Sequence, residues 1–418
     1  GVEADTLLRR GKMAPVGEVH RRIDPPVDLA DWRHLSPAEQ RVSLDSLLRE
    51  DRRQGFDPAA APLMRIRLIR LADEVHQLVW THHHLLFDGW SRPVLLGEAL
   101  ELYEAARERG EANLPAVRPY RDYIGWLQRQ DRDAARRFWQ EYLRGFSTTT
   151  PLALSGTVGE PAGERSAIEW LHLSPEDSRA LQWKLRQEHL TLNTFFQGLW
   201  ALELAHLSGL RDVVFGTVVS GRPAELEGIE TSVGLFINTL PMRVRLATGD
   251  RFWSWLDRLQ LAHAELRQYE ATPLVEIQGW SEVPRGLPLF ESLLVFENFP
   301  ADVSLQARRS LRFRDLDHAL IESNYPVMAG SGPGESISLR VFHDLRRAST
   351  SHVRHLLADI AVLAGRVLAG PEVSLAELLA ELARAAEERR ALQARDAARA
   401  GRDWLSQIAR RKAGQDSR

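Results

Sequence analysis

Two neighbouring segments in the first quarter of the chain show the period of two that is typical of β-strands. In residues 64–71 apolar side chains alternate with arginines, and residues 75–84 are apolar and rich in β-branched side chains. The three residues between them, 72–74, have the composition of a turn. The pattern therefore predicts a β-hairpin, which would deliver the segment after it to one edge of a sheet.

A helical pattern follows the hairpin, from Ser91 to about Arg109. Pro93 falls in its first turn, where proline is tolerated, and Asp88 and Gly89 supply turn chemistry just before it. We expect Ser91 to act as the N-cap of this helix. The side chains that we expect on its buried face are Leu95, Leu96, Ala99, Leu102 and Tyr103.

The pattern changes twice more before the middle of the chain. Residues 123–145 predict a second helix that ends at a glycine, with apolar side chains four residues apart at Ala134, Phe138 and Tyr142. Residues 148–165 are rich in Thr, Gly and Pro and carry no period. This composition is typical of a linker between domains, so we expect a boundary there.

Helical and strand patterns alternate again beyond this linker. Residues 192–207 are apolar nearly all round, which predicts a buried helix, and Val213–Val219 is a continuous apolar run that predicts a central strand. A mixture of helices and strands on both sides of the linker indicates two α/β layers that pack on one another. The predicted organisation is an N-terminal subdomain at residues 1–147, a linker at 148–165, a second subdomain at 166–375 and a helical tail at 376–418.

The tail is a long run of good helix formers, with leucines at 375, 378, 379 and 382 on one side. From Glu381 to the end of the chain, ten residues are basic and six are acidic, so the tail is modestly cationic. Two interpretations stay open: a solvated extension, or a docking element for a partner protein.

Composition excludes several classes of function. The 418 residues, 44% of them hydrophobic, suffice for about two domains. A net charge of −3 argues against a nucleic-acid partner. The absence of cysteine excludes a thiolate nucleophile and disulfides, so any thioester must arrive on another molecule. The absence of cysteine also fits a reducing compartment. No window reaches the roughly eighteen apolar residues of a membrane span. We expect a cytoplasmic protein without membrane contact.

Three histidines, His82, His83 and His84, end the predicted hairpin. Because neighbouring side chains of a strand face opposite ways, we expect His82 and His84 to share a face that His83 does not. A histidine can accept a proton near neutral pH, so a general base is one interpretation. A hydrogen-bonded structural histidine is another, and a metal site formed by His82 and His84 is a third. The chain has no H-E-x-x-H motif or cysteine to complete such a site, so we expect no metal.

Residues 83–89, His-His-Leu-Leu-Phe-Asp-Gly, match the HHxxxDG signature of the condensation domains of nonribosomal peptide synthetases. Residues 120–126 resemble the YxDYxxW element of this family, and residues 233–243 resemble its VGxFxNTLxxR element. Shorter segments at 220–223, 269–274 and 324–326 are also similar to family segments. The motifs occur in the family's order, and the resemblance covers most of residues 15–375.

The resemblance implies an α/β (α+β) fold of two chloramphenicol-acetyltransferase-like subdomains, a V-shaped pseudodimer with a central tunnel. It also implies an acyltransferase that joins a carrier-protein-bound acyl or aminoacyl thioester to an acceptor amine, which forms an amide bond. The partners would be donor and acceptor carrier proteins, or a free small-molecule acceptor. Phosphopantetheine would be supplied by these partner proteins, so we expect no cofactor bound by this chain itself.

The HHxxxDG motif assigns roles to its residues. We expect His84 to take the proton of the amine, or else to orient the amine or stabilise the tetrahedral oxyanion. His83 would support it through hydrogen bonding, Asp88 would hold the shape of the loop, and the backbone N–H of Gly89 is a candidate oxyanion donor. Expected substrate contacts are Trp90, Ser91 and Asn324, whereas Phe236, Ile237 and Asn238 are expected to be core and loop scaffold.

The chain also departs from the family pattern. Two further motifs usually precede HHxxxDG, and the 82 residues before His83 lack them. In the family an arginine from that part is thought to pair with the Asp of the signature. We therefore expect Asp88 to lack its usual partner within this chain.

Alternatives remain on the same fold. An ester-forming condensation with a hydroxyl acceptor, or chain release, would use the same base. A catalytically silent recruitment domain usually has a damaged histidine motif, so the intact motif favours an enzyme. Cyclising domains carry DxxxxD, which is absent here, and the order Asp88-Gly89-Trp90-Ser91 most resembles domains that take an L-configured or non-amino-acid acyl donor.

Overall fold

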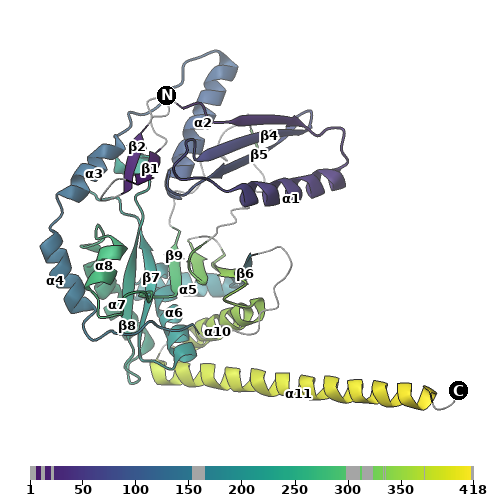
Figure 1. Ribbon diagram of the computed structural model, residues 1–418. Helices are drawn as coiled ribbons and strands as arrows, with labels where there is room; N and C mark the ends of the chain where they lie inside the picture. Colours follow the sequence, from purple (N-terminus) through teal and green to yellow (C-terminus); the bar gives the residue numbers. More distant parts are fainter. Residues whose placement is uncertain are drawn as a thin grey trace. The chain divides into compact units, whose positions relative to one another are not determined.

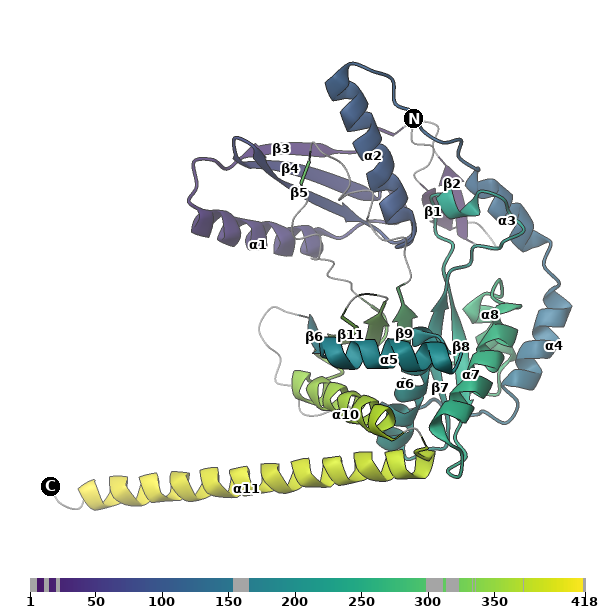
Figure 2. The same ribbon diagram turned by 180° about the vertical axis from the view of Figure 1, so that it is seen from behind.

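The computed structural model folds the chain into two compact units that both combine helices with strands (Figure 1; Figure 2 shows them from behind). The first unit contains the described parts of Gly1–Gln128, Arg222–Ile237 and Phe299–Arg314, and the second contains those of Arg129–Gly221, Asn238–Asn298 and Asp315–Arg418. The described residues are 6–10, 15–19, 23–152, 165–297, 311–312, 323–332, 334, 336–370 and 372–415. The prediction of a mixed α/β fold is confirmed.

The first unit is built on a three-stranded sheet with the order β3-β4-β5. Its strands are β3 (Val27–Asp31), β4 (Met64–Ala72) and β5 (Val75–His82). The strands β4 and β5 pair antiparallel as the predicted hairpin. However, β5 ends at His82, so the alternation of faces does not extend to the next two histidines as we expected. A separate pair, β1 (Thr6–Arg10) and β2 (Pro15–Val19), is antiparallel.

In the described part of this unit, the α-helices are α1 (Pro37–Gln54), α2 (Ser91–Glu108) and α3 (Tyr120–Gln128). The expectation for α2 was wrong in two respects. Ser91 is its first residue rather than its N-cap. Leu100 is buried, whereas Leu102 and Tyr103 are exposed. The apolar residues of α2 occupy more than one face, so periodicity alone does not identify the face that packs.

The predicted helix at 123–145 is in fact two helices, α3 and α4 (Arg132–Tyr142). The side chain of Asp131 accepts a hydrogen bond from the Ala134 N–H, at 2.9 Å, and so caps the start of α4. The side chain of Asp131 thus takes the place of the backbone carbonyl oxygen that a continuous helix would offer to this N–H. The path of the chain is therefore interrupted between α3 and α4.

The division between the units also differs from the predicted boundary. It falls at Gln128 and Arg129 because α4 belongs to the second unit, where Trp139 and Leu143 are buried in the main core. The start of the predicted linker is fixed there too, since Thr150 Oγ1 accepts a hydrogen bond from the backbone N–H of Val214 at 2.8 Å. Residues 153–164 of that linker lie outside the described residues.

The second unit contains a six-stranded mixed sheet with the order β6-β11-β10-β9-β7-β8. Its strands are β6 (Ser166–His172), β7 (Asp212–Val219), β8 (Asn238–Arg245), β9 (Ser292–Phe296), β10 (Val327–Ser331) and β11 (Ser338–Asp344). The neighbours β7, β9 and β10 run parallel, and the other pairs are antiparallel. Its other helices are α5 (Pro175–Gln187), α6 (Leu192–Ser208), α7 (Phe252–Arg267), α8 (Leu274–Trp280), α10 (Thr350–Ala369) and α11 (Leu375–Gln415).

The helix α6 lies at the centre of the core of this unit and packs on β7 and β9. The prediction of a buried helix and of a central strand at 213–219 is confirmed, since Phe195–Ala205 is buried throughout and β7 lies between β9 and β8. Close packing explains Gly198, where a Cβ atom would lie 2.3 Å from Leu256 Cδ2.

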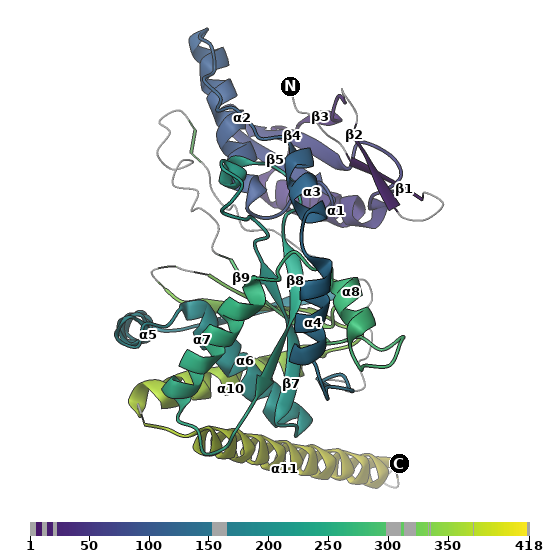
Figure 3. The same ribbon diagram turned by 90° about the vertical axis from the view of Figure 1, so that its left-hand side faces the viewer.

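The helix α11 packs on α10 and α6 (Figure 3). Its four leucines at 375, 378, 379 and 382 are buried, as the pattern predicted. Further along, Arg389 forms two hydrogen bonds of 2.6 Å with the buried carboxylate of Asp359 on α10. The first part of the predicted tail is therefore core, and the described side chains after Arg389 are exposed. No helix in the described part of the chain combines the length and the apolar character that a membrane span requires.

Candidate active site

The HHxxxDG residues lie on the loop that connects β5 to α2 in the first unit. The backbone N–H of His83 donates to the carbonyl oxygen of Leu63 at 2.9 Å, which fixes the start of the loop to the residue directly before β4. The Nδ1 atom of His83 accepts a hydrogen bond from the Leu85 N–H at 3.1 Å. Burial lowers the pKa of His83 below its usual value, with a smaller contribution from His84. The backbone and the side chain of His83 therefore both stabilise the conformation of this turn.

His84 differs from its two neighbours because its side chain is exposed. Within the described residues its imidazole has no hydrogen bond to protein. Both ring nitrogens are therefore available to a substrate, which a proton acceptor requires.

His82 is the last residue of β5 and is half-buried, whereas His84 lies beyond the strand and is exposed. The ring of His82 stacks on Phe87, with 4.2 Å between the centroids, and lies 5.4 Å from the ring of Trp80. Burial lowers its pKa to about 4, so this imidazole is neutral at pH 7. Among the described residues no group of three or more His, Cys, Asp or Glu side chains has the arrangement of a metal site.

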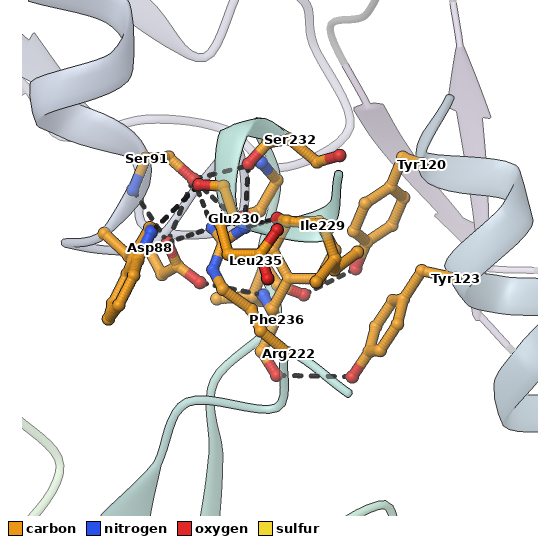
Figure 4. A network of polar contacts seen from close by, with 12 residues as sticks. Asp88, Ser91, Tyr120, Tyr123, Arg222, Ile229, Glu230, Ser232, Leu235 and Phe236 are labelled. Carbon is orange, nitrogen blue, oxygen red and sulfur yellow. Dashed lines mark hydrogen bonds and ion pairs between the residues drawn. The ribbon is translucent and has the colours of Figure 1, made fainter. Parts of the chain in front are cut away.

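Asp88 is the centre of a buried polar network, which also includes Ser91, Arg222, Gly234 and Phe236 (Figure 4). We call these five residues the Asp88 network. The Asp88 Oδ1 atom accepts from the Ser91 N–H at 3.0 Å and from the Ser91 hydroxyl at 2.9 Å. The Oδ2 atom accepts from the Phe236 N–H at 3.1 Å. A carboxylate so enclosed holds the loop and is not accessible to a substrate.

The cationic partner of Asp88 is Arg222, which lies after HHxxxDG and not in the part before it from which the resemblance implies the usual arginine. The Arg222 Nη2 atom lies 3.1 Å from Asp88 Oδ1, and both side chains are at most 4% exposed. The guanidinium also donates to the carbonyl oxygens of Ile229 and Ser232 and lies 4.0 Å from the centre of the Phe236 ring. Burial lowers the pKa of Arg222, and the charge of Asp88 opposes this effect. The pair satisfies two charges that would otherwise be costly to bury.

Ser91 has a different role from the substrate contact that we expected. Its side chain is fully buried, and its hydroxyl contacts Asp88, Arg222 and the backbone of Gly234. No surface of the hydroxyl remains for a substrate. The neighbouring Trp90 is half-buried, and its indole N–H donates to the Glu230 carbonyl oxygen at 3.0 Å.

The other predicted residues are Gly89 in the first unit and Asn324 and Asn238 in the second. Gly89 lies in the turn directly after Asp88, and within the described residues its N–H has no acceptor. Asn324 lies in the second unit, where it is exposed and its carbonyl oxygen accepts from Arg347 at 3.2 Å. Asn238 is scaffold, as expected, because its amide donates to the carbonyl oxygens of Glu270 and Thr272.

Sequence reasoning missed Arg222, although it lies in a segment that we identified as similar to the family. The one sequence feature that could have indicated it was the charge of Asp88. A loop aspartate with a structural role must be buried, and a buried carboxylate requires a cation. An arginine between two family motifs was a candidate for that cation, but nothing in one sequence selects it from the other arginines.

Replacing Arg222 with Ala should therefore destabilise the first unit strongly. The change leaves the Asp88 charge buried without its cation, which costs about 3–5 kcal/mol in comparable buried pairs. Chemical denaturation followed by tryptophan fluorescence measures the free energy of unfolding. The matched control is Arg53→Ala, which removes an exposed ion pair with Glu50 on α1 and should leave the unfolding midpoint unchanged. Equal midpoints for the two variants would contradict the assignment.

Comparison with known proteins identifies the family of this chain. The family model described as Condensation domain matches residues 6–341. One protein of the linear gramicidin synthase of Brevibacillus parabrevis is 40% identical over 385 residues, which is 90% of this chain and 7% of that protein. A second protein of the same synthase is 46% identical over 316 residues, which is 75% of this chain and 6% of that protein. The chain thus spans a small part of these relatives.

Solved structures share the fold at low identity. The X-domain from teicoplanin biosynthesis has a TM-score of 0.73 and 18% identity, and the match covers 89% of this chain and 85% of that one. A mutant of the starter condensation domain of rhizomide synthetase has a TM-score of 0.68 and 14% identity, and covers 88% and 83%. With the HHxxxDG loop, its buried aspartate and the family model matched over most of its length, this chain belongs to the condensation domains of nonribosomal peptide synthetases.

Proposed function

We propose that this domain forms an amide bond between an acyl or aminoacyl thioester on a donor carrier protein and the amine of an acceptor. The observation that carries the proposal is the exposed imidazole of His84 on a loop that the buried Asp88 and Arg222 fix. Condensation domains of these synthetases work with carrier-protein domains, whose phosphopantetheine arms present the substrates. This chain would need no bound cofactor, because the arms bring both reactants.

The chemistry suits a single histidine. The amine attacks the thioester carbonyl, so a C–N bond forms, the C–S bond breaks, and the sulfur leaves on the donor arm. An α-amine has a pKa near ~8, so part of it is neutral at pH 7 and able to attack, and its nitrogen must lose one proton as the C–N bond forms. His84 accepts that proton and returns it to the departing sulfur. Holding the two arms end to end supplies further rate enhancement, on the order of 7–11 kcal/mol in good cases.

The other residues of the loop assist without contacting the proton. The Gly89 N–H lies beside the N-terminus of α2, where positive partial charge stabilises an oxyanion. Asp88 would compete with the amine for a proton if it were free, but its oxygens are occupied by donors within the Asp88 network. Trp90 and Asn324 remain our predictions for contacts with substrate. Docking of a partner through α11 also remains a prediction.

His84→Ala should lower the rate of acyl transfer by about 100-fold to 10,000-fold, the usual contribution of a general base. The assay loads a carrier protein with an acyl-phosphopantetheine donor, offers an amine or an alcohol, and follows both products by intact-protein mass spectrometry. His76→Ala is the matched control, because His76 is exposed on β5 of the same hairpin. Transfer to the alcohol alone would reassign the domain to ester formation. An unchanged rate in His84→Ala would contradict the role of this histidine, and carrier binding without transfer would favour a recruitment domain.

His82 should make the stability of the domain sensitive to acid. Its folded pKa of about 4 lies below the unfolded value near ~6.5, so the unfolded chain binds more protons between these values. Stability is therefore lost as the pH falls through this window, by about 2 kcal/mol between pH 7 and pH 5. His82→Met should remove that part of the loss and keep the packing on Phe87, whereas His76→Met should not. Urea unfolding at pH 7 and pH 5 measures the decrease in the free energy of unfolding. An equal decrease in both variants would contradict this account.

A further inference from the structure

Two tyrosines of the YxDYxxW element contact the segment Gly234–Phe236 within the first unit (Figure 4). The hydroxyl of Tyr120 donates to the Leu235 carbonyl oxygen at 2.5 Å, and the hydroxyl of Tyr123 donates to the Phe236 carbonyl oxygen at 3.3 Å. The rings of both tyrosines also pack on the ring of Phe236, with centroids 5.2 and 4.8 Å away. The element therefore fixes this segment through both polar and apolar contacts.

Gly234 makes this approach possible. A Cβ atom at Gly234 would lie 2.4 Å from Cδ2 and 2.6 Å from Cε2 of the Tyr120 ring, closer than real Cβ atoms come to other groups. Only glycine lets the ring lie directly against the backbone at this point. The close contact leaves the segment little freedom to shift.

Two residues of this segment, Gly234 and Phe236, also contact the rest of the Asp88 network through other backbone groups. The Gly234 carbonyl oxygen accepts from the Asp88 N–H at 3.0 Å, and the Gly234 N–H donates to the Ser91 hydroxyl at 3.1 Å. The Phe236 N–H donates to Asp88 Oδ2. The segment thus connects the tyrosine hydroxyls to the carboxylate that holds the His84 loop.

We propose that Tyr120 and Tyr123 are positioning residues of the active site, because their hydroxyls fix Gly234–Phe236 and, through this segment, the loop that carries His84. The inference rests on the proposed function of His84. Burial raises the pKa of Tyr120 to about 12, and the charge of Asp88 adds to the effect, so its hydroxyl remains a donor at any pH used in an assay.

Tyr120→Phe tests the proposal, because it removes the hydroxyl and keeps the ring against Gly234. We expect kcat for acyl transfer to fall about ten-fold, the factor that corresponds to the loss of about 1.4 kcal/mol from one hydrogen bond. The KM for the carrier-bound substrates should stay within about two-fold of wild type, since the tyrosine hydroxyls donate to backbone carbonyl oxygens of the protein. Tyr123→Phe removes a longer hydrogen bond and should have a smaller effect in the same direction.

Tyr142→Phe is the matched control. Tyr142 is a half-buried tyrosine of the second unit whose hydroxyl donates to the Arg243 carbonyl oxygen at 3.3 Å and accepts from the Arg243 N–H at 2.9 Å. Its loss should lower thermal stability but leave kcat unchanged well below the melting temperature. If Tyr120→Phe and Tyr142→Phe lower kcat only in proportion to their unfolded fractions, the tyrosine is structural and the proposal is wrong.

A second measurement does not depend on activity. Amide hydrogen exchange of residues 83–91 should be about ten-fold faster in Tyr120→Phe than in wild type, and unchanged in Tyr142→Phe. Gly234→Ala should also increase this exchange, and adding Tyr120→Phe to it should increase the rate less than the product of the single effects, because both changes act on one segment. If wild type transfers no acyl group, the proposed function fails, yet the exchange rates still decide whether these tyrosines hold the loop. Wild-type exchange in Tyr120→Phe would overturn the inference.

Discussion

The buried negative charge of Asp88 is the constraint on which the active-site loop depends. A carboxylate that is 1% exposed is tolerable only when donors and a cation surround it, and here Ser91, Phe236 and Arg222 meet that requirement. Each donor comes from a fixed position in the first unit. The contacts of this charge therefore hold the loop in one conformation. That conformation positions the exposed His84.

This constraint also explains why distant motifs of the sequence occur together. Arg222 and residues 234–236 lie more than 130 residues after Asp88, on the connection between β7 and β8 of the second unit, and this connection belongs to the first unit. The loop is thus completed by a segment whose two ends are strands of the other unit. Phe236 contributes both its N–H to Asp88 and its ring to Arg222, so one residue of the VGxFxN element satisfies both members of the ion pair.

Local patterns of the sequence predicted the elements that depend on local chemistry. The hairpin of β4 and β5, the buried α6 and the strand β7 followed from periodicity, and the HHxxxDG loop followed from the motif. Features that depend on long-range contacts were not predictable in this way. Serine is a residue type that often caps helices, but the hydroxyl of Ser91 donates to Asp88 instead. The break before α4 depends on a single capping aspartate, Asp131, and the partner of Asp88 lies 134 residues away in the chain. The V-shaped arrangement and its tunnel stay predictions.

The central claim is that Asp88 and Arg222 act as one unit that holds the His84 loop. A double-mutant cycle on kcat/KM for acyl transfer tests it most directly, with Asp88→Asn, Arg222→Met and the two changes combined. The account predicts that each single variant has a lower kcat/KM than wild type. The combined variant should have a kcat/KM no lower than that of the less active single variant, because the second change removes a residue whose partner is already absent. Losses that multiply in the combined variant would show that the two residues act independently, and would contradict the account.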